Sequence, residues 1–202
     1  MSSILVIDGH PNPESLTAAL AQSYAGAAAG SRLIALRDLD FDVHMRFGYT
    51  ARMDLEPDLA EAREAVHAAK HLVIFTPVWW RSMPPLLKGF FDRAFLPKQE
   101  YRYRSNGLPE GLLKGRSARA IITSDTPKFL QALMPDTKLK SLTRGTLGFC
   151  GFKPVKATYL APVKGSTPQQ RATWIETAAA LGRQDASQVP ANPRGALSTT
   201  AG

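Results

Sequence analysis

Two segments of the chain hold residues that could bind a ligand, and each follows a short apolar run. The first is GHPNPESLT, residues 9–17, which places His10, Asn12 and hydroxyl groups ahead of an expected helix. A helix start offers unpaired N–H groups and the positive end of its dipole, so this segment predicts a phosphate site to which Leu16 and Thr17 belong. It matches neither GxxxxGK[ST] nor GxGxxG. Ser15 alternatively serves only as the helix N-cap.

The second segment is TPVWWRSMPPLLKGFFDRAF, residues 76–95, and it predicts a wall for a flat ring. Trp79 and Trp80 follow a buried apolar run, at the strand end where open α/β sheets bind ligands. Consecutive strand residues point to opposite sides, so we place Trp80, with the backbone from Pro77 through Val78 to Trp80, against the ring and the Trp79 side chain nearby. Core or dimer packing is the alternative for both tryptophans.

The elements that must position these segments alternate along the chain. Apolar runs predict five strands, at residues 4–7, 32–36, 71–76, 118–123 and 155–160. Helices are expected over residues 15–29, 57–70, 84–95 and 130–149, and from a Thr-x-x-Gln capping box at Thr167 to near Gly182. We therefore predict an α/β fold, a flavodoxin-like three-layer α/β/α arrangement with a five-stranded parallel sheet of order 2-1-3-4-5. In that order the loops at Gly9 and Pro77 meet in one crevice.

The composition favours one globular domain of 202 residues, which we divide into residues 1–182 and a polar, disordered C-terminal tail over residues 183–202. The 25 Lys and Arg against 17 Asp and Glu are scattered, so the formal charge of +8 indicates a solvated surface attractive to a phosphate and no nucleic-acid partner. The lone Cys150 and the absence of a Cys/His cluster predict no disulfide and no metal. We expect a cytoplasmic protein without stable membrane insertion.

Two long segments have no clear period, residues 37–56 and 97–115, and loops of this length are usually functional. Tyr49, Tyr101 and Tyr103 lie on them. Asp125, at the end of the fourth strand, either caps the following segment or lies near the ring.

The chain resembles the flavodoxin-like NAD(P)H:quinone oxidoreductases, the DT-diaphorase group and its bacterial relatives. The resemblance spans residues 4 to about 181 and rests on ILVIDGHPNPESLTAAL, TPVWWRSMPPLLKGFFDRAF, GLPEGLLKGRSARAIIT and GTLGFCGF. It implies that His10, Ser15, Leu16 and Thr17 bind the flavin phosphate and that residues 77–80 line the isoalloxazine edge. Residues 123–126 fall where the family commonly has Thr-Thr-Gly-Gly, which implies ring contacts for Thr123, Ser124 and Asp125.

This third block also departs from the family. DT-diaphorase-like members follow it with a Tyr and a His that line the substrate pocket, whereas here no histidine follows His71 and only Phe129 stands near the tyrosine position. The family's proton relay is therefore not transferred. Asp125 in place of a glycine is compatible with a reduced flavin only if its carboxylate turns away to cap a backbone, which leaves Ser124 and main-chain N–H groups as the partners of the polar ring edge.

The resemblance implies ping-pong hydride transfer from NADH or NADPH to the flavin, followed by two-electron reduction of a quinone or similar acceptor, with no side-chain nucleophile or base. FMN is favoured over FAD, because no adenine site is evident. Trp80, Phe129 and Tyr49 are the expected substrate contacts, and a homodimer is implied in which the two long segments donate walls or simply pack. The alternatives are a regulatory ancillary subunit of a membrane transport system and a flavodoxin-like electron carrier, although the positive charge argues against a carrier.

Overall fold

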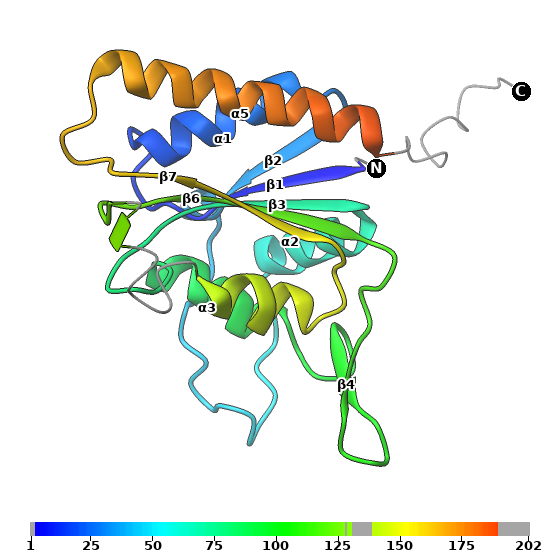
Figure 1. Cartoon of the computed structure of the whole chain (residues 1–202). Helices are drawn as coiled ribbons and strands as arrows, with labels where there is room; N and C mark the ends of the chain where they lie inside the picture. The colour runs from blue at the N-terminus through cyan, green and yellow to red at the C-terminus, as the bar shows by residue number, and fades with distance from the viewer. Residues whose placement is uncertain (1–2, 128, 131–138, 190–202) are drawn as a thin grey trace, which may run out of the picture.

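Five strands form one parallel sheet at the centre of the molecule (Figure 1). The computed structural model describes residues 3–127, 129–130 and 139–189. The five strands pair in the order β2-β1-β3-β6-β7, which confirms the predicted order, with β6 and β7 as its fourth and fifth strands. They are β1 (Ile4–Asp8), β2 (Ser31–Ala35), β3 (His71–Pro77), β6 (Ser117–Thr123) and β7 (Val155–Leu160). Because helices cover both faces, β1 and β3 are buried along their whole length, as their continuous apolar runs predict.

Helices form the two outer layers (Figure 1). Helices α1 and α5 pack together on one face, where Leu20, Tyr24, Phe75 and Ala178 share a core cluster. Helices α2 and α3 cover the other face, around a second cluster. The helices are α1 (Leu16–Ala27), α2 (Pro57–Ala68), α3 (Pro85–Ala94) and α5 (Pro168–Gln188), with a 3-10 turn η1 (Leu36–Asp38) and a π-helix η2 (Ser141–Gly148).

The helices begin where the sequence predicts them. Ser15 is the N-cap of α1 and its hydroxyl accepts a hydrogen bond from the Ala18 N–H at 3.1 Å. Thr167 caps α5 in the same way, through the Gln170 N–H at 3.1 Å. Helices α2, α3 and α5 each have proline in the first turn, where its missing N–H costs little. Of the helical stretch predicted over residues 130–149, residues 131–138 lie outside the described residues.

The predicted end of the last helix near Gly182 is wrong, because α5 continues to Gln188. Asp185 is buried, and its carboxylate accepts hydrogen bonds from the Arg119 Nε and Nη2 at 2.6 and 2.7 Å and from the Tyr24 hydroxyl at 2.7 Å. These partners hold the additional turns against β6 and α1. Residues 183–188, which the prediction assigned to the tail, therefore pack on the domain, and residues 190–202 lie outside the described residues.

The two long segments project from the side of the sheet that α3 covers (Figure 1). Beyond η1, the first has no helix or strand within residues 39–56. The second segment was predicted to be irregular, but it contains an antiparallel hairpin of β4 (Tyr101–Tyr103) and β5 (Pro109–Gly111). Glu110 holds this hairpin by accepting hydrogen bonds from Arg102, Arg104 and Lys114. Among the described residues, no helix is both long and apolar enough to cross a membrane.

Candidate functional site

The loops that follow β1, β3 and β6 meet at the carboxyl edge of the sheet. The Gly9 N–H donates to the Phe75 carbonyl at 2.9 Å, and the Val78 N–H donates to the Thr123 carbonyl at 2.8 Å. The hydroxyls of Thr17 and Thr123 are hydrogen-bonded at 2.9 Å, and both residues are buried. The first and third strands are neighbours in the sheet, so the loops at Gly9 and Pro77 are adjacent, and the crevice between them stays a prediction.

A buried carboxylate fixes the first of these loops. Asp8 is 1% exposed and its Oδ1 accepts a hydrogen bond from the His10 N–H at 3.0 Å. Arg37, which follows β2, donates to Asp8 Oδ2 and also to the His10 carbonyl at 3.2 Å. Sequence reasoning missed both Asp8 and Arg37. A carboxylate that ends the apolar run ILVID was the available signal, because a buried charge needs a partner.

The imidazole of His10 accepts a hydrogen bond at one nitrogen and can donate from the other. Its Nδ1 accepts the Asn12 N–H at 3.0 Å, and its ring meets the Trp79 ring edge-on with centroids 5.5 Å apart. Burial lowers the pKa of His10 below its usual 6.5, against the opposing effect of Asp8. The neutral ring therefore holds its proton on Nε2, since Nδ1 is an acceptor.

The start of α1 adds further donors beside this ring. Asn12 Oδ1 accepts the Glu14 N–H at 2.9 Å and shapes the turn into the helix. Ser15 uses its oxygen as the N-cap acceptor, which leaves its O–H able to donate. The N–H groups of Leu16 and Thr17 open the helix and have no acceptor within it. This donor set, with the His10 Nε2–H, fits a phosphate group.

Trp79 and Trp80 lie in a tight turn and do not continue the strand, which ends at Pro77. Trp79 and Ser82 exchange two main-chain hydrogen bonds of 2.8 Å, and the residues between them, Trp80 and Arg81, have φ angles of 48° and 63°. Positive φ costs a residue with a side chain roughly 1 kcal/mol, and such strain often occurs at binding sites. Trp80 is 99% exposed and Trp79 is 40% exposed.

The geometric reason for choosing Trp80 over Trp79 is therefore wrong, because the alternation of side chains holds only along an extended strand. A turn displays Trp80 to solvent and leaves Trp79 beside His10. The assignment of Trp80 to the ring stays a prediction.

The segment after β6 presents one polar group and turns another away. The Ser124 oxygen accepts the Thr126 N–H at 3.1 Å, and its hydroxyl hydrogen remains a donor. Asp125 Oδ1 accepts the Lys164 N–H at 2.6 Å, so its carboxylate caps the loop after β7. The cap predicted for Asp125 was on the segment after the fourth strand, whereas in the structure its carboxylate caps a backbone N–H of the loop after β7. This arrangement meets the condition under which an aspartate is compatible with a reduced ring at this edge.

The structure brings most of the predicted site residues to one edge of the sheet, but not Tyr49. Tyr49 lies on the first long segment, 70% exposed, and Phe129 is 71% exposed. A cavity of about 830 Å³ lies between residues 45–63 and 92–99 and is not lined by these edge loops. The predicted residues on the edge loops or at the ends of the elements that the loops join are His10, Asn12, Ser15, Leu16, Thr17, Pro77, Val78, Trp79, Trp80, Thr123, Ser124 and Asp125.

Comparisons with known proteins identify the fold and the family. The family model for the flavodoxin-like fold (Flavodoxin_2) matches residues 2–181. FMN-dependent NADH:quinone oxidoreductase 1 of Xanthomonas euvesicatoria pv. vesicatoria is 30% identical over 168 residues, which cover 78% of this chain and 81% of that protein. A crystal structure of Smu.1420 from Streptococcus mutans UA159 superposes with a TM-score of 0.80 at 31% identity, and the match covers 90% of this chain and 98% of the other.

Other curated relatives are matched over less of their length. NAD(P)H dehydrogenase (quinone) 1 of Cavia porcellus is 29% identical over 126 residues, which cover 60% of this chain and 45% of that protein. The matches to an NAD(P)H oxidoreductase of Haemophilus influenzae and to an FMN-dependent NADH:quinone oxidoreductase 2 of Listeria innocua cover 61% and 66% of those proteins. The chain thus spans about half to two thirds of these relatives.

Proposed function

The chain belongs to the flavodoxin-like NAD(P)H:quinone oxidoreductase family, and from this premise we propose that it oxidises NADH or NADPH with a bound flavin and passes two electrons to a quinone or similar acceptor. The observation that most supports the proposal is the meeting of the loops after β1, β3 and β6 around the His10 Nε2–H and the start of α1. FMN is the proposed cofactor, because the described site offers donors for one phosphate and the Xanthomonas relative is named as FMN-dependent.

The phosphate end of the cofactor is assigned to the first loop. His10 would donate from Nε2, Ser15 from its hydroxyl, and Leu16 and Thr17 from their N–H groups. Asp8 and Arg37 would act behind these residues by fixing the His10 backbone. Asn12 would shape the loop, with its side-chain N–H groups still able to donate.

The ring is assigned to the loops after β3 and β6. Residues 77–80 would border one edge, and the Ser124 hydroxyl would donate to the polar edge. The bound flavin supplies the hydride acceptance and the two-electron delivery. The side chains then need only to bind, orient and shield, in keeping with the absence of an assigned nucleophile or base.

The visible absorption of the flavin tests this function directly. We expect the purified protein, supplied with FMN and freed of excess, to retain a flavin band that bleaches on anaerobic addition of NADPH or NADH and returns on addition of a quinone. A bound flavin that neither nucleotide reduces would contradict the enzymatic assignment. Failure to retain any flavin would contradict the site itself.

The two tryptophans can be separated by mutation. Trp80→Ala should weaken flavin retention or turnover more than Trp79→Ala, and it should leave the thermal midpoint unchanged because the Trp80 side chain has no packing to lose. Trp79→Ala removes the ring contact with His10 and should mainly affect stability. Flavin titration and thermal unfolding of both variants measure the contrast. Equal and negligible effects on the flavin would remove the ring-edge role from this turn.

A homodimer completes the proposal. Phe47, Tyr49 and Tyr103 are 53%, 70% and 63% exposed on the two long segments, which project away from the chain's own edge loops (Figure 1). Large exposed aromatic side chains are typical of interfaces. These segments would therefore face a second copy of the chain and line one side of the flavin ring that this copy binds. Sedimentation velocity should give a dimer at micromolar concentration, and a monomer throughout would contradict this arrangement.

A further inference from the structure

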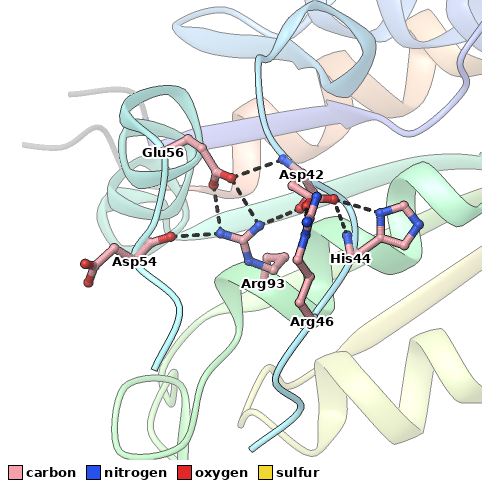
Figure 2. Close-up of polar contacts among 6 residues, drawn as sticks. All are labelled: Asp42, His44, Arg46, Asp54, Glu56 and Arg93. Atoms are coloured by element: carbon pink, nitrogen blue, oxygen red, sulfur yellow. Dashed lines mark hydrogen bonds and ion pairs between the residues drawn. The ribbon is translucent and has the colours of Figure 1, made fainter. Parts of the chain in front are cut away.

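One buried side chain holds the first long segment at residue 42 and again at residues 54–56 (Figure 2). We use the name excursion loop for residues 42–56. Arg93 of α3, with a side chain 1% exposed, donates to the Asp42 carbonyl, to the Asp54 carbonyl at 2.9 Å and to Glu56 Oε2 at 2.9 Å. Glu56 Oε1 also accepts the Asp42 N–H at 3.1 Å. The guanidinium fork thus joins the outgoing and the returning chain at the neck of the loop.

Gly89 lies four residues before Arg93, on the same face of α3, and provides the second contact. A Cβ at position 89 would lie 2.6 Å from Val43 Cβ and 2.7 Å from the Val43 carbonyl oxygen. The outgoing chain therefore crosses the helix at a distance that only glycine permits. Gly89 is the glycine of the LLKG motif, and its place inside a helix is otherwise unfavourable.

Further contacts stiffen the loop and connect its far part to the second long segment. Asp42 accepts hydrogen bonds from the His44 N–H at 2.9 Å and from Arg46 Nε at 2.7 Å (Figure 2), and these bonds lower the pKa of Asp42. At the far part, burial and a hydrogen bond with Tyr49 raise the pKa of Tyr101. Tyr101 in turn packs edge-on against Phe149, with ring centroids 4.9 Å apart.

We propose that Gly89 and Arg93 are positioning residues that place the excursion loop, and with it Tyr49 and Phe47, so that the loop forms a wall of the quinone-acceptor site. The inference rests on the proposed function, in which these aromatic side chains face the ring bound by a second copy. The Arg93 hydrogen bonds and the close approach at Gly89 are made to the excursion loop. Gly89 lies in the middle of α3 and Arg93 lies in its last turn. The Trp79–Ser82 loop, by contrast, precedes the helix.

The proposal predicts that two variants release the loop without harming flavin binding. Arg93→Lys keeps the positive charge and loses the fork, and Gly89→Ala forces Val43 away while giving α3 a residue of higher helix propensity. Matched controls are available for both. Arg183→Lys alters an exposed ion pair on α5, and Gly26→Ala alters a helical glycine with open space around it.

Limited proteolysis reads the position of the loop independently of activity. Arg46 and Arg52 are trypsin sites within the loop, with side chains 68% and 89% exposed. Cleavage at these two sites should be about tenfold faster in Arg93→Lys and Gly89→Ala than in the wild type. The first variant loses a charged hydrogen bond, worth about that factor in local opening, and the second displaces Val43 at the neck of the loop. The two controls should cleave at the wild-type rate. Unchanged cleavage in both variants would overturn the positioning role.

Kinetics then separate the acceptor site from the flavin site. With 1,4-naphthoquinone as the acceptor, KM should rise several-fold in both variants, while the FMN dissociation constant and the rate of anaerobic bleaching by NADPH stay within about twofold. Faster proteolysis with an unchanged quinone KM would overturn the acceptor role, as would equal losses in both half-reactions. A wild-type protein whose FMN is not reduced would instead refute the proposed function, and proteolysis would still report the loop.

Discussion

The loops that follow β1, β3 and β6 are joined to one another through the main chain, whereas the excursion loop is joined to the fold through α3. At the sheet edge, hydrogen bonds from Gly9 to Phe75 and from Val78 to Thr123 continue the pairing of the parallel strands. The excursion loop has no strand to extend, so its neck depends on the Arg93 guanidinium and its crossing depends on Gly89. The positions of the sheet-edge loops thus follow from the strand order, whereas the position of the excursion loop depends on an arginine and a glycine in α3.

Removing the Arg93 side chain should have the largest effect on stability of the changes considered, and it tests whether the two regions are held separately. Arg93→Ala leaves the Glu56 carboxylate and two carbonyl groups without their buried partner, so the free energy of unfolding should fall by about 3 kcal/mol. Urea unfolding measures this loss. FMN affinity of the remaining folded protein should stay near the wild-type value. An affinity loss as large as the stability loss would show that the two regions are not held separately.

A smaller effect is expected at the sheet edge, where one side-chain contact does matter. Asp8→Asn keeps one acceptor for the His10 N–H and weakens the ion pair with Arg37, which should cost about 1.5 kcal/mol and weaken FMN binding by about tenfold. FMN titration by fluorescence measures the change. Asp38→Asn is the matched control, because Asp38 pairs with the same arginine at 3.8 Å but is 72% exposed. Similar losses in both variants would contradict a specific role for Asp8.

The smallest effect should appear in the pH dependence of stability. Since burial lowers the pKa of His10 in the folded protein, the unfolded chain binds this proton more readily, and stability falls as the pH drops below 6.5 towards the folded value. His10→Gln lacks this dependence. Thermal midpoints measured between pH 7.5 and 5 should therefore decline less for the variant than for the wild type. Parallel declines would indicate that His10 is as accessible to protons in the folded state as in the unfolded chain.

The difference between the sheet-edge loops and the excursion loop also explains what the sequence alone could predict. The strands, their order and the helix starts follow from local signals, such as the apolar run of β3 and the caps at Ser15 and Thr167. Loops that follow neighbouring parallel strands must then share an edge, so most of the site residues were found together. The turn at Trp80 was not foreseen, because positive φ at a tryptophan has no local sequence signal.

The features that sequence reasoning missed depend on partners far along the chain. Arg93 contacts residues 37 and 51 positions away, and Asp185 contacts Arg119 and Tyr24 at separations of 66 and 161 residues. A polar helix end such as residues 183–188 looks like a tail unless the buried cation that it pairs with is known. Similarly, LLKG reads as an amphipathic helix, and only the crossing of Val43 explains its glycine.

The long-range contact between Tyr24 and Asp185 also bears on how this protein is made. During synthesis the first helix and the first strands leave the ribosome well before residue 185, so the layer formed by α1 lacks its covering helix until α5 emerges. Until then, Tyr24, Leu20 and the buried guanidinium of Arg119 have no α5 to cover them. The nascent domain therefore exposes an apolar face for most of its translation, and chaperones that bind such faces would meet it in this interval.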